Sequence, residues 1–256
     1  MLSPLSSVAL FVAGVVAGAI NSVAGGGSLI SFPSLVASGL PAIVANATNT
    51  AAIWPGSLSS ALAYAPDVRR DTRLLVTLLV PSLVGGLLGA IVLVSTPPEL
   101  FAQVVPYLVL FATLLFATQG RLSRWTRSHA TEGDHVGQVG RISGFLLQLF
   151  VASYGGYFGA GIGILMLGSF SLIGLRDIHR MNGLKTVLAT VINVVAFLFL
   201  AAEGLVVWPV AVVMGAGTVL GGWLGARGAK RISQETLRAL VISVGLLVSA
   251  WLFWSR

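Results

Sequence analysis

Long apolar stretches alternate with short polar ones along the whole chain, and this pattern predicts helices that cross a membrane. Residues 1–66 contain no charged side chain, and the runs 74–94, 142–175, 186–202 and 204–226 are also free of charge. A spanning helix needs about 20 apolar residues, so these runs are long enough for several crossings. We therefore expect an all-α integral membrane protein.

Ten apolar segments can be placed, five in each half of the chain. Those of the first half lie at 5–24, 28–38, 42–65, 74–94 and 101–119. Those of the second half lie at 142–158, 162–175, 183–202, 205–226 and 237–254. The expected organisation is a first transmembrane repeat (1–119), a polar cytoplasmic linker (120–140) and a second transmembrane repeat (141–256), all in one integrated membrane domain.

The two halves share a weak internal repeat. A shift of 136 positions places the run GGLLGA, which begins at Gly85, on the run GGWLGA, which begins at Gly221. The same shift places Glu99 on Glu235. Internal symmetry of this kind is frequent in secondary transporters.

The basic residues predict how each half is inserted. The loop at 66–73 and the linker at 120–140 carry three arginines each, whereas the loop STPPE between them has none. In the second half the pattern is reversed, because AEGLVVW has no basic residue and RGAKRISQE has three. Basic loops stay in the cytoplasm, so we expect two inverted-topology repeats with both termini on the outer side. A simple helix bundle with a duplicated, non-transport role is the alternative.

Composition agrees with a membrane location. The chain is 56% hydrophobic and 9% charged, whereas soluble domains carry about a quarter charged residues. Its net charge of +7 lies mostly in short loops, which indicates membrane orientation and no nucleic-acid partner. We expect a multi-pass protein of the cell (inner) membrane, with the lipid bilayer as its solvent. A homodimer is compatible with this arrangement.

Two glycine-rich stretches interrupt corresponding apolar segments. They are NSVAGGGS at 21–28 and YGGYFGAGIG at 154–163. Glycine is a poor helix former, so we expect broken or re-entrant helices that meet near the membrane midplane. Close packing of helices through small residues is the alternative. The pattern leaves open whether 28–38 and 162–175 span the membrane or turn back.

A helix that begins inside the membrane presents free backbone N–H groups and a positive dipole end, which together favour an anion. The candidate substrate-binding residues in these stretches are Asn21, Gly25, Gly26, Gly27, Ser28, Tyr154, Gly159, Gly161 and Gly163.

A polar cluster follows each glycine-rich stretch. The cluster of the first half is Asn46, Asn49 and Thr50, and that of the second is Asn182, Lys185 and Thr186. Both have the spacing of one helical face, so all six are candidate binding residues. Lys185 is either a lysine that snorkels to the membrane edge or the positive charge that attracts an anion. Arg176 and Arg180 are candidates for the cytoplasmic entry.

The acidic residues and histidines exclude other kinds of chemistry. No carboxylate lies in the middle of an apolar segment, so neither a buried proton relay nor a metal site is expected, and no cofactor is implied. The histidines, His129, His135 and His179, lie outside the apolar runs, which argues against an enzyme. Together with Lys185, the lack of embedded acids also argues against a cation transporter.

The runs AGAINSVAGGGSLISFPSLVASGLPAIVANATNT and YGGYFGAGIGILMLGSFSLIGLRDIHRMNGLKT resemble the paired signatures of the TauE/SafE sulfite-exporter family. The resemblance extends over about 12–231. It implies a transporter that exports sulfite or related sulfur-containing anions such as organosulfonates. We therefore predict export of such oxyanions by alternating access. The alternatives are an anion channel, or an ion-coupled importer of a sulfur-containing or other small organic anion.

Overall fold

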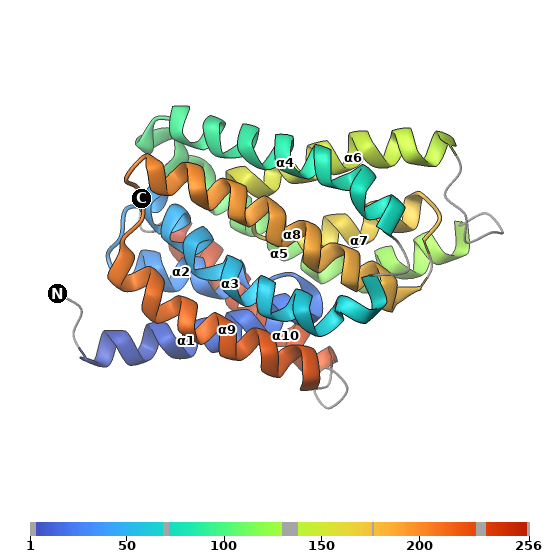
Figure 1. The fold of residues 1–256 in the computed structure, drawn as a ribbon. Coiled ribbons are helices and arrows are strands. Elements are labelled where there is room, and N and C mark those ends of the chain that lie inside the picture. The colour runs from blue at the N-terminus through green and yellow to red at the C-terminus, as the bar shows by residue number, and fades with distance from the viewer. Residues whose placement is uncertain (1–3, 69–71, 130–137, 176, 229–233, 255–256) are drawn as a thin grey trace.

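The fold is built from helices that lie roughly along one axis (Figure 1). This computed structural model describes residues 4–68, 72–129, 138–175, 177–228 and 234–254, and within them it contains ten helices and no strand. The helices are α1 (Pro4–Ala24), α2 (Ser28–Ala37), α3 (Ala42–Val68), α4 (Thr72–Ser95), α5 (Pro98–His129), α6 (Gln138–Tyr157), α7 (Ile162–Leu172), α8 (Ile178–Ala202), α9 (Trp208–Gly228) and α10 (Gln234–Trp254). Each predicted apolar segment is therefore confirmed as a helix.

Helix length separates the helices that can cross a membrane alone from those that cannot. Among the described residues, five stretches are long and apolar enough to span: Pro4–Val23, Thr72–Ser95, Pro98–Thr118, Arg180–Ala202 and Trp208–Arg227. By contrast, α2 has 10 residues and α7 has 11. At about 1.5 Å per residue each is roughly 15 Å long, about half the hydrocarbon thickness.

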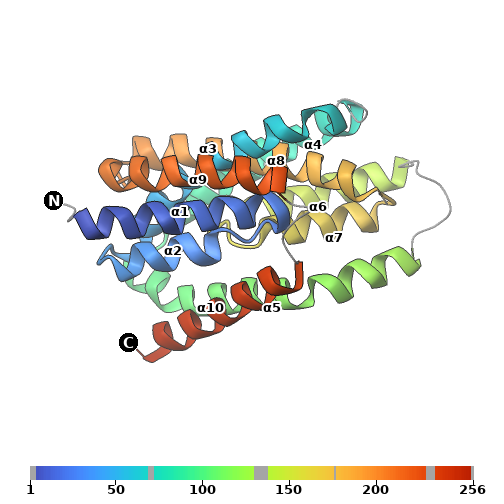
Figure 2. The same cartoon turned by 90° about the horizontal axis from the view of Figure 1, so that it is seen from below.

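The two short helices turn back beside the helices that precede them. Figure 2 shows α1 and α2 entering from the end of the bundle that holds both termini. In the same view the pair α6 and α7 enters from the opposite end of the bundle. The loops that join each pair lie in the middle of the bundle.

Glycine seams join helices that are distant in sequence. Helix α1 packs on α9, and α4 packs on α6. A Cβ atom on Gly221 would overlap the carbonyl oxygen of Val15, and one on Gly89 would overlap that of Ser153. The repeated glycine runs thus let one backbone lie directly on another, as small residues do between membrane helices.

The interruptions are shorter than the glycine-rich stretches suggested. Helix α1 continues to Ala24 and α6 continues to Tyr157, so only 25–27 and 158–161 leave the helices. Gly156 is helical and packs on the backbone of Gly86, which leaves no room for a side chain. The close-packing alternative therefore applies to this glycine.

The segment expected as a linker, 120–140, is partly helical. Helix α5 extends into it as far as His129, and α6 begins within it at Gln138. The residues between, 130–137, lie outside the described residues, as do Arg69, Arg70, Arg176, Lys230 and Arg231.

Candidate functional site

The two glycine loops touch each other in the middle of the bundle. Gly25 has a φ of +77°, a conformation that side chains other than glycine rarely adopt. A Cβ atom on Gly25 would lie 2.7 Å from the Cα atom of Gly163, at the first turn of α7. Only glycine at both positions allows the first loop and α7 to approach this closely.

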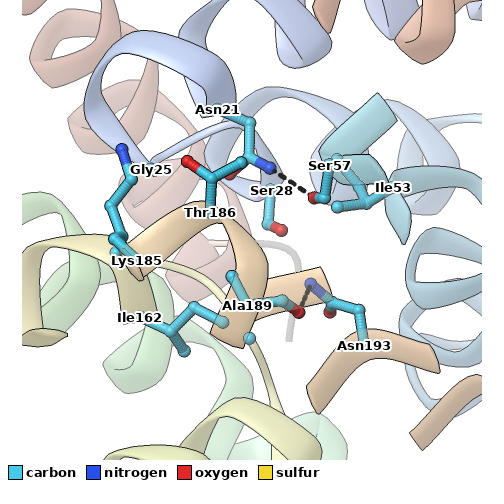
Figure 3. A pocket seen from close by; sticks show the side chains of 12 residues that line it. Asn21, Gly25, Ser28, Ile53, Ser57, Ile162, Lys185, Thr186, Ala189 and Asn193 are labelled. Carbon is cyan, nitrogen blue, oxygen red and sulfur yellow. Dashed lines mark hydrogen bonds between the residues drawn. The ribbon is translucent and has the colours of Figure 1, made fainter. Parts of the chain in front are cut away.

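A small cavity lies beside this contact, between α1, α3, α7 and α8 (Figure 3). Its volume is about 10 Å³, close to the least that one water molecule needs. The residues that line it are Asn21, Gly25, Ser28, Ile53, Ser57, Gly159, Ile162, Gly163, Lys185, Thr186, Ala189 and Asn193. Residues from both halves of the chain therefore line the same cavity.

Lys185 brings the one charged side chain of this lining. Only 2% of its surface is exposed, so it does not snorkel to the membrane edge. Its Nζ donates a hydrogen bond to Asn182 Oδ1 at 3.1 Å, and in the part of the chain that the structure describes no carboxylate pairs with it. Figure 3 shows the side chain extending toward the loop that carries Gly25.

The two short helices begin at this cavity. Ser28 is the first residue of α2 and Ile162 the first of α7, and both line the space. The first N–H groups of a helix have no partner within the helix, and they carry the positive end of its dipole. The N–H groups of Leu29, Ile30, Ile162 and Ile164 donate to carbonyl oxygens of the loop glycines, so the helix starts contribute mainly the positive ends of their dipoles. Together with the buried ammonium group of Lys185, these dipole ends favour an anion.

In the first half, Asn49 occupies the position that corresponds to Lys185, but it binds α2 instead of lining the cavity. It donates from Nδ2 to Ser28 Oγ at 3.3 Å, and its Oδ1 accepts a hydrogen bond from Ser31 Oγ. Both hydrogen bonds are buried. Asn49 therefore fixes the start of α2, and with it Ser28.

Two further predicted residues hold the second glycine loop. Asn46 donates from Nδ2 to the carbonyl oxygen of Tyr157 at 2.8 Å. The hydroxyl of Tyr154 donates to the carbonyl oxygen of Ala160 at 2.7 Å. Neither residue lines the cavity. Both instead hold the backbone at and beside the second glycine loop, which forms part of the cavity wall.

The remaining predicted residues also pack behind the cavity. A Cβ atom on Gly26 would lie 2.7 Å from the ring of Phe116, and one on Gly27 would overlap the carbonyl oxygen of Ala17. Gly161 precedes α7 with a φ of +80°.

The other two polar-cluster residues that lie off the cavity, Thr50 and Asn182, form hydrogen bonds within their own helices. Thr50 donates to the carbonyl oxygen of Asn46 at 2.9 Å, and Asn182 accepts from Lys185. Of the predicted entry residues, Arg180 lies in the first turn of α8, while Arg176 is not among the described residues.

Five lining residues were not among the predicted site: Ile53, Ser57, Ile162, Ala189 and Asn193. The signal for two of them was present, because Ser57 and Asn193 are separated by the repeat offset of 136 and each lies two turns beyond its polar cluster. Asn21 Nδ2 donates to Ser57 Oγ at 2.9 Å, and Asn193 Nδ2 donates to the carbonyl oxygen of Ala189 at 2.9 Å.

Metal chemistry finds no support in the side chains. Over the described ranges, no group of three or more histidine, cysteine, aspartate or glutamate residues could hold a metal ion.

Known proteins place this architecture in a family of transporters. The profile of the family described as "Sulfite exporter TauE/SafE" matches residues 10–252. A "Probable membrane transporter protein" of Haemophilus influenzae is 27% identical over 96% of this chain and 94% of its own length. The "Probable membrane transporter protein ORF9" of a Sinorhizobium species is 29% identical over 94% of this chain and 89% of its own length.

A third relative, the "Probable membrane transporter protein YfcA" of Escherichia coli K12, is 27% identical over 99% of this chain and 92% of its own length. No solved structure matches the chain. These names indicate membrane transporters and not enzymes. Because the family profile covers nearly the whole chain, the protein is a membrane transporter of the TauE/SafE sulfite exporter family.

Proposed function

We propose that the protein exports small sulfur-containing oxyanions, sulfite or an organosulfonate, by alternating access. The observation that carries this proposal is the buried Lys185 in a cavity lined by two helix starts and no carboxylate. Such a site attracts anions and disfavours cations. The description of the family points to the same substrate class.

The helix contacts support two inverted repeats. If α1 to α5 are exchanged with α6 to α10 in order, the packing of α1 on α9 becomes that of α6 on α4, and both pairs occur. The packing of α3 on α9 likewise becomes that of α8 on α4, and both occur. Figures 1 and 2 show the two termini at the same end of the bundle, which we assign to the outer side of the inner membrane.

In this arrangement the two short helices are re-entrant. Each is about half as long as a crossing requires, and each lies beside the helix that precedes it. Irregular backbone at membrane depth must be buried in protein or line a cavity. Gly25 and Gly159 meet this condition because both are in the lining of the site.

The transport cycle follows from these parts. An anion enters from the cytoplasm near Arg176 and Arg180, whose charges raise its local concentration. It then enters the cavity and binds Lys185 and Ser28, beside the positive dipole ends of α2 and α7. The halves rock against each other and the site opens outward. A monovalent anion that leaves a negative interior gains about 2.3 kcal/mol per 100 mV, so export needs no coupling ion.

The test is efflux of labelled sulfite from proteoliposomes under an imposed membrane potential. Lys185→Ala should reduce flux at least tenfold, because about 1.4 kcal/mol of lost binding already changes affinity tenfold. The matched control is Arg227→Ala, which also removes one positive charge but lies at the end of α9, over the ring of Trp223.

Saturable, potential-driven flux that is lost in Lys185→Ala and kept in Arg227→Ala is the expected result. Flux that does not saturate would indicate a channel. Unchanged flux in the folded Lys185→Ala protein would remove Lys185 from the binding site.

A further inference from the structure

The charge of the cavity suggests which substrates it accepts. Eleven of its twelve lining residues are uncharged, and the exception is Lys185. Its hydrogen-bond partner, Asn182, is a neutral amide. The lining therefore carries a single positive charge with no acidic side chain to compensate it.

The elements around the cavity add little to this balance. Helices α1, α2 and α7 contain no ionisable side chain anywhere in their sequences. The ionisable residues of α3 are Tyr64 and Asp67, near the end of that helix. Those of α8 besides Lys185 are His179 and Arg180, in its first turn.

The ionisable residues of α6 are Arg141, close to its start, and the two tyrosines of its last turn. The hydroxyl group of Tyr154 donates its hydrogen bond to the carbonyl oxygen of Ala160. Arg180 and Arg141 both lie at helix ends remote from the glycine loops in sequence, so Lys185 supplies the charge at the cavity itself.

A closed site in the membrane interior should be close to electrically neutral, because uncompensated charge is costly where the dielectric constant is low. One singly charged anion neutralises Lys185. A doubly charged anion would leave its second negative charge opposite only the partial positive ends of α2 and α7, whose first N–H groups mostly donate to loop carbonyl oxygens already. This electrostatic cost depends on the charge of the substrate and not on its shape.

Resting on the proposed function, we propose that the site selects singly charged oxyanions. Among sulfur compounds these are hydrogen sulfite and alkyl sulfonates, whereas the sulfite dianion and sulfate are excluded. The transported form of sulfite is then hydrogen sulfite. Lys185 is the residue that determines this specificity.

Methanesulfonate and sulfate make a matched pair of probes. Both are tetrahedral and of similar size, but methanesulfonate carries one negative charge and sulfate two. Wild-type protein in liposomes is loaded with labelled methanesulfonate, with the membrane potential held at zero and the ionic strength constant. Unlabelled methanesulfonate should inhibit the labelled flux at a concentration at least tenfold lower than sulfate does.

A pH series supplies the second arm. Hydrogen sulfite loses its proton near neutral pH, whereas methanesulfonate stays singly charged throughout. At fixed total sulfite, flux should fall by up to about tenfold per pH unit once the dianion dominates, as mass action requires. Methanesulfonate flux over the same range measures any titration of the protein, Lys185 included, and the sulfite flux should fall more steeply than the methanesulfonate flux.

The outcomes separate the two levels of the proposal. Equal inhibition by sulfate and methanesulfonate, or sulfite flux that does not follow hydrogen sulfite, overturns the charge selection while leaving an anion carrier. Absence of saturable flux of both methanesulfonate and sulfite overturns the proposed function, and the charge selection with it.

Discussion

Lys185 is held in place by surprisingly few polar contacts for a buried ammonium group. Its Nζ has one hydrogen bond, to Asn182, and the methylene chain passes close to Gly163, where an added Cβ would lie 3.2 Å from Lys185 Cδ. A buried charge without an opposite charge is costly. In the proposed site, a ligand that brings one negative charge offsets this cost, so we expect Lys185 both to provide the affinity for an anion and to limit the charge that the anion can carry.

The positive charge of Lys185 can be neutralised by a carboxylate introduced into the cavity lining. Asn193 lines the same space and lies two turns beyond Lys185 on α8. Asn193→Asp is nearly isosteric but adds a carboxylate that competes with the substrate for Lys185. We expect flux of methanesulfonate at low concentration to fall at least tenfold, equivalent to about 1.4 kcal/mol of binding.

Asn193→Ala is the control, because it also removes the hydrogen bond to Ala189 but adds no charge. The aspartate variant should be clearly the less active of the two in initial-rate measurements. Equal activity would show that a negative charge in the lining does not affect the substrate.

At the scale of elements, the hairpins α1–α2 and α6–α7 depend on glycine at their tips for two separable reasons. Gly25 combines a φ of +77° with close contact to Gly163. Gly204, between α8 and α9, has a similar φ of +72° but no atom within 4 Å of an added Cβ. Substitutions at Gly25 and Gly204 therefore distinguish the cost of backbone strain, which both would have, from the cost of close packing, which only Gly25 would have.

Gly25→Ala should push the tips apart and abolish flux, and it should lower the melting temperature of the purified protein more than Gly204→Ala does. Backbone strain alone costs about 1 kcal/mol, and both variants carry it. Overpacking adds a further 1–3 kcal/mol or so to Gly25→Ala only. Similar melting temperatures and fluxes for the two variants would show that the tips tolerate separation.

At the scale of the whole molecule, the direction of each helix follows from the arrangement in Figure 2. The chain has no cysteine, so single cysteines can report the side of the membrane without background. Glu203→Cys precedes α9 and Arg227→Cys lies in its last turn, and both positions are exposed.

With outward termini, an impermeant maleimide should label Glu203→Cys in intact cells and Arg227→Cys only after lysis. The two sites lie at opposite ends of one helix, so each serves as the control for the other. The reverse pattern would place the termini in the cytoplasm and invert the direction assigned to transport.

The helices could be predicted from the sequence because a long uncharged segment in a membrane must satisfy its own backbone hydrogen bonds, and a helix does so. It also singled out the glycine loops and Lys185, which line one cavity in the structure, because glycine runs and a lysine in an apolar segment are rare. It did not separate residues that line the cavity from residues that support it. Asn49 and Lys185 occupy corresponding positions, yet only Lys185 reaches the cavity.

Ser57 and Asn193 were missed for a related reason. Polar residues in a helix are common, and which of them face a cavity depends on helix rotation and on the neighbours that pack beside them. Ile53 and Ala189 carry no polar signal at all, and only three-dimensional packing places them in the lining.

The glycine seams of α9 on α1 and of α4 on α6 have a consequence for the proposed rocking of the halves. At Gly221 and Val15, and at Gly89 and Ser153, the backbone of one helix lies directly on that of the other. Two helices with interdigitated side chains can slide only if those side chains change rotamers. Helices that meet through glycine do not need such a change at the contact. In the proposed rocking of the halves, these contacts would allow small lengthwise shifts between the paired helices, so the glycines that bring the helices together would also leave them free to slide.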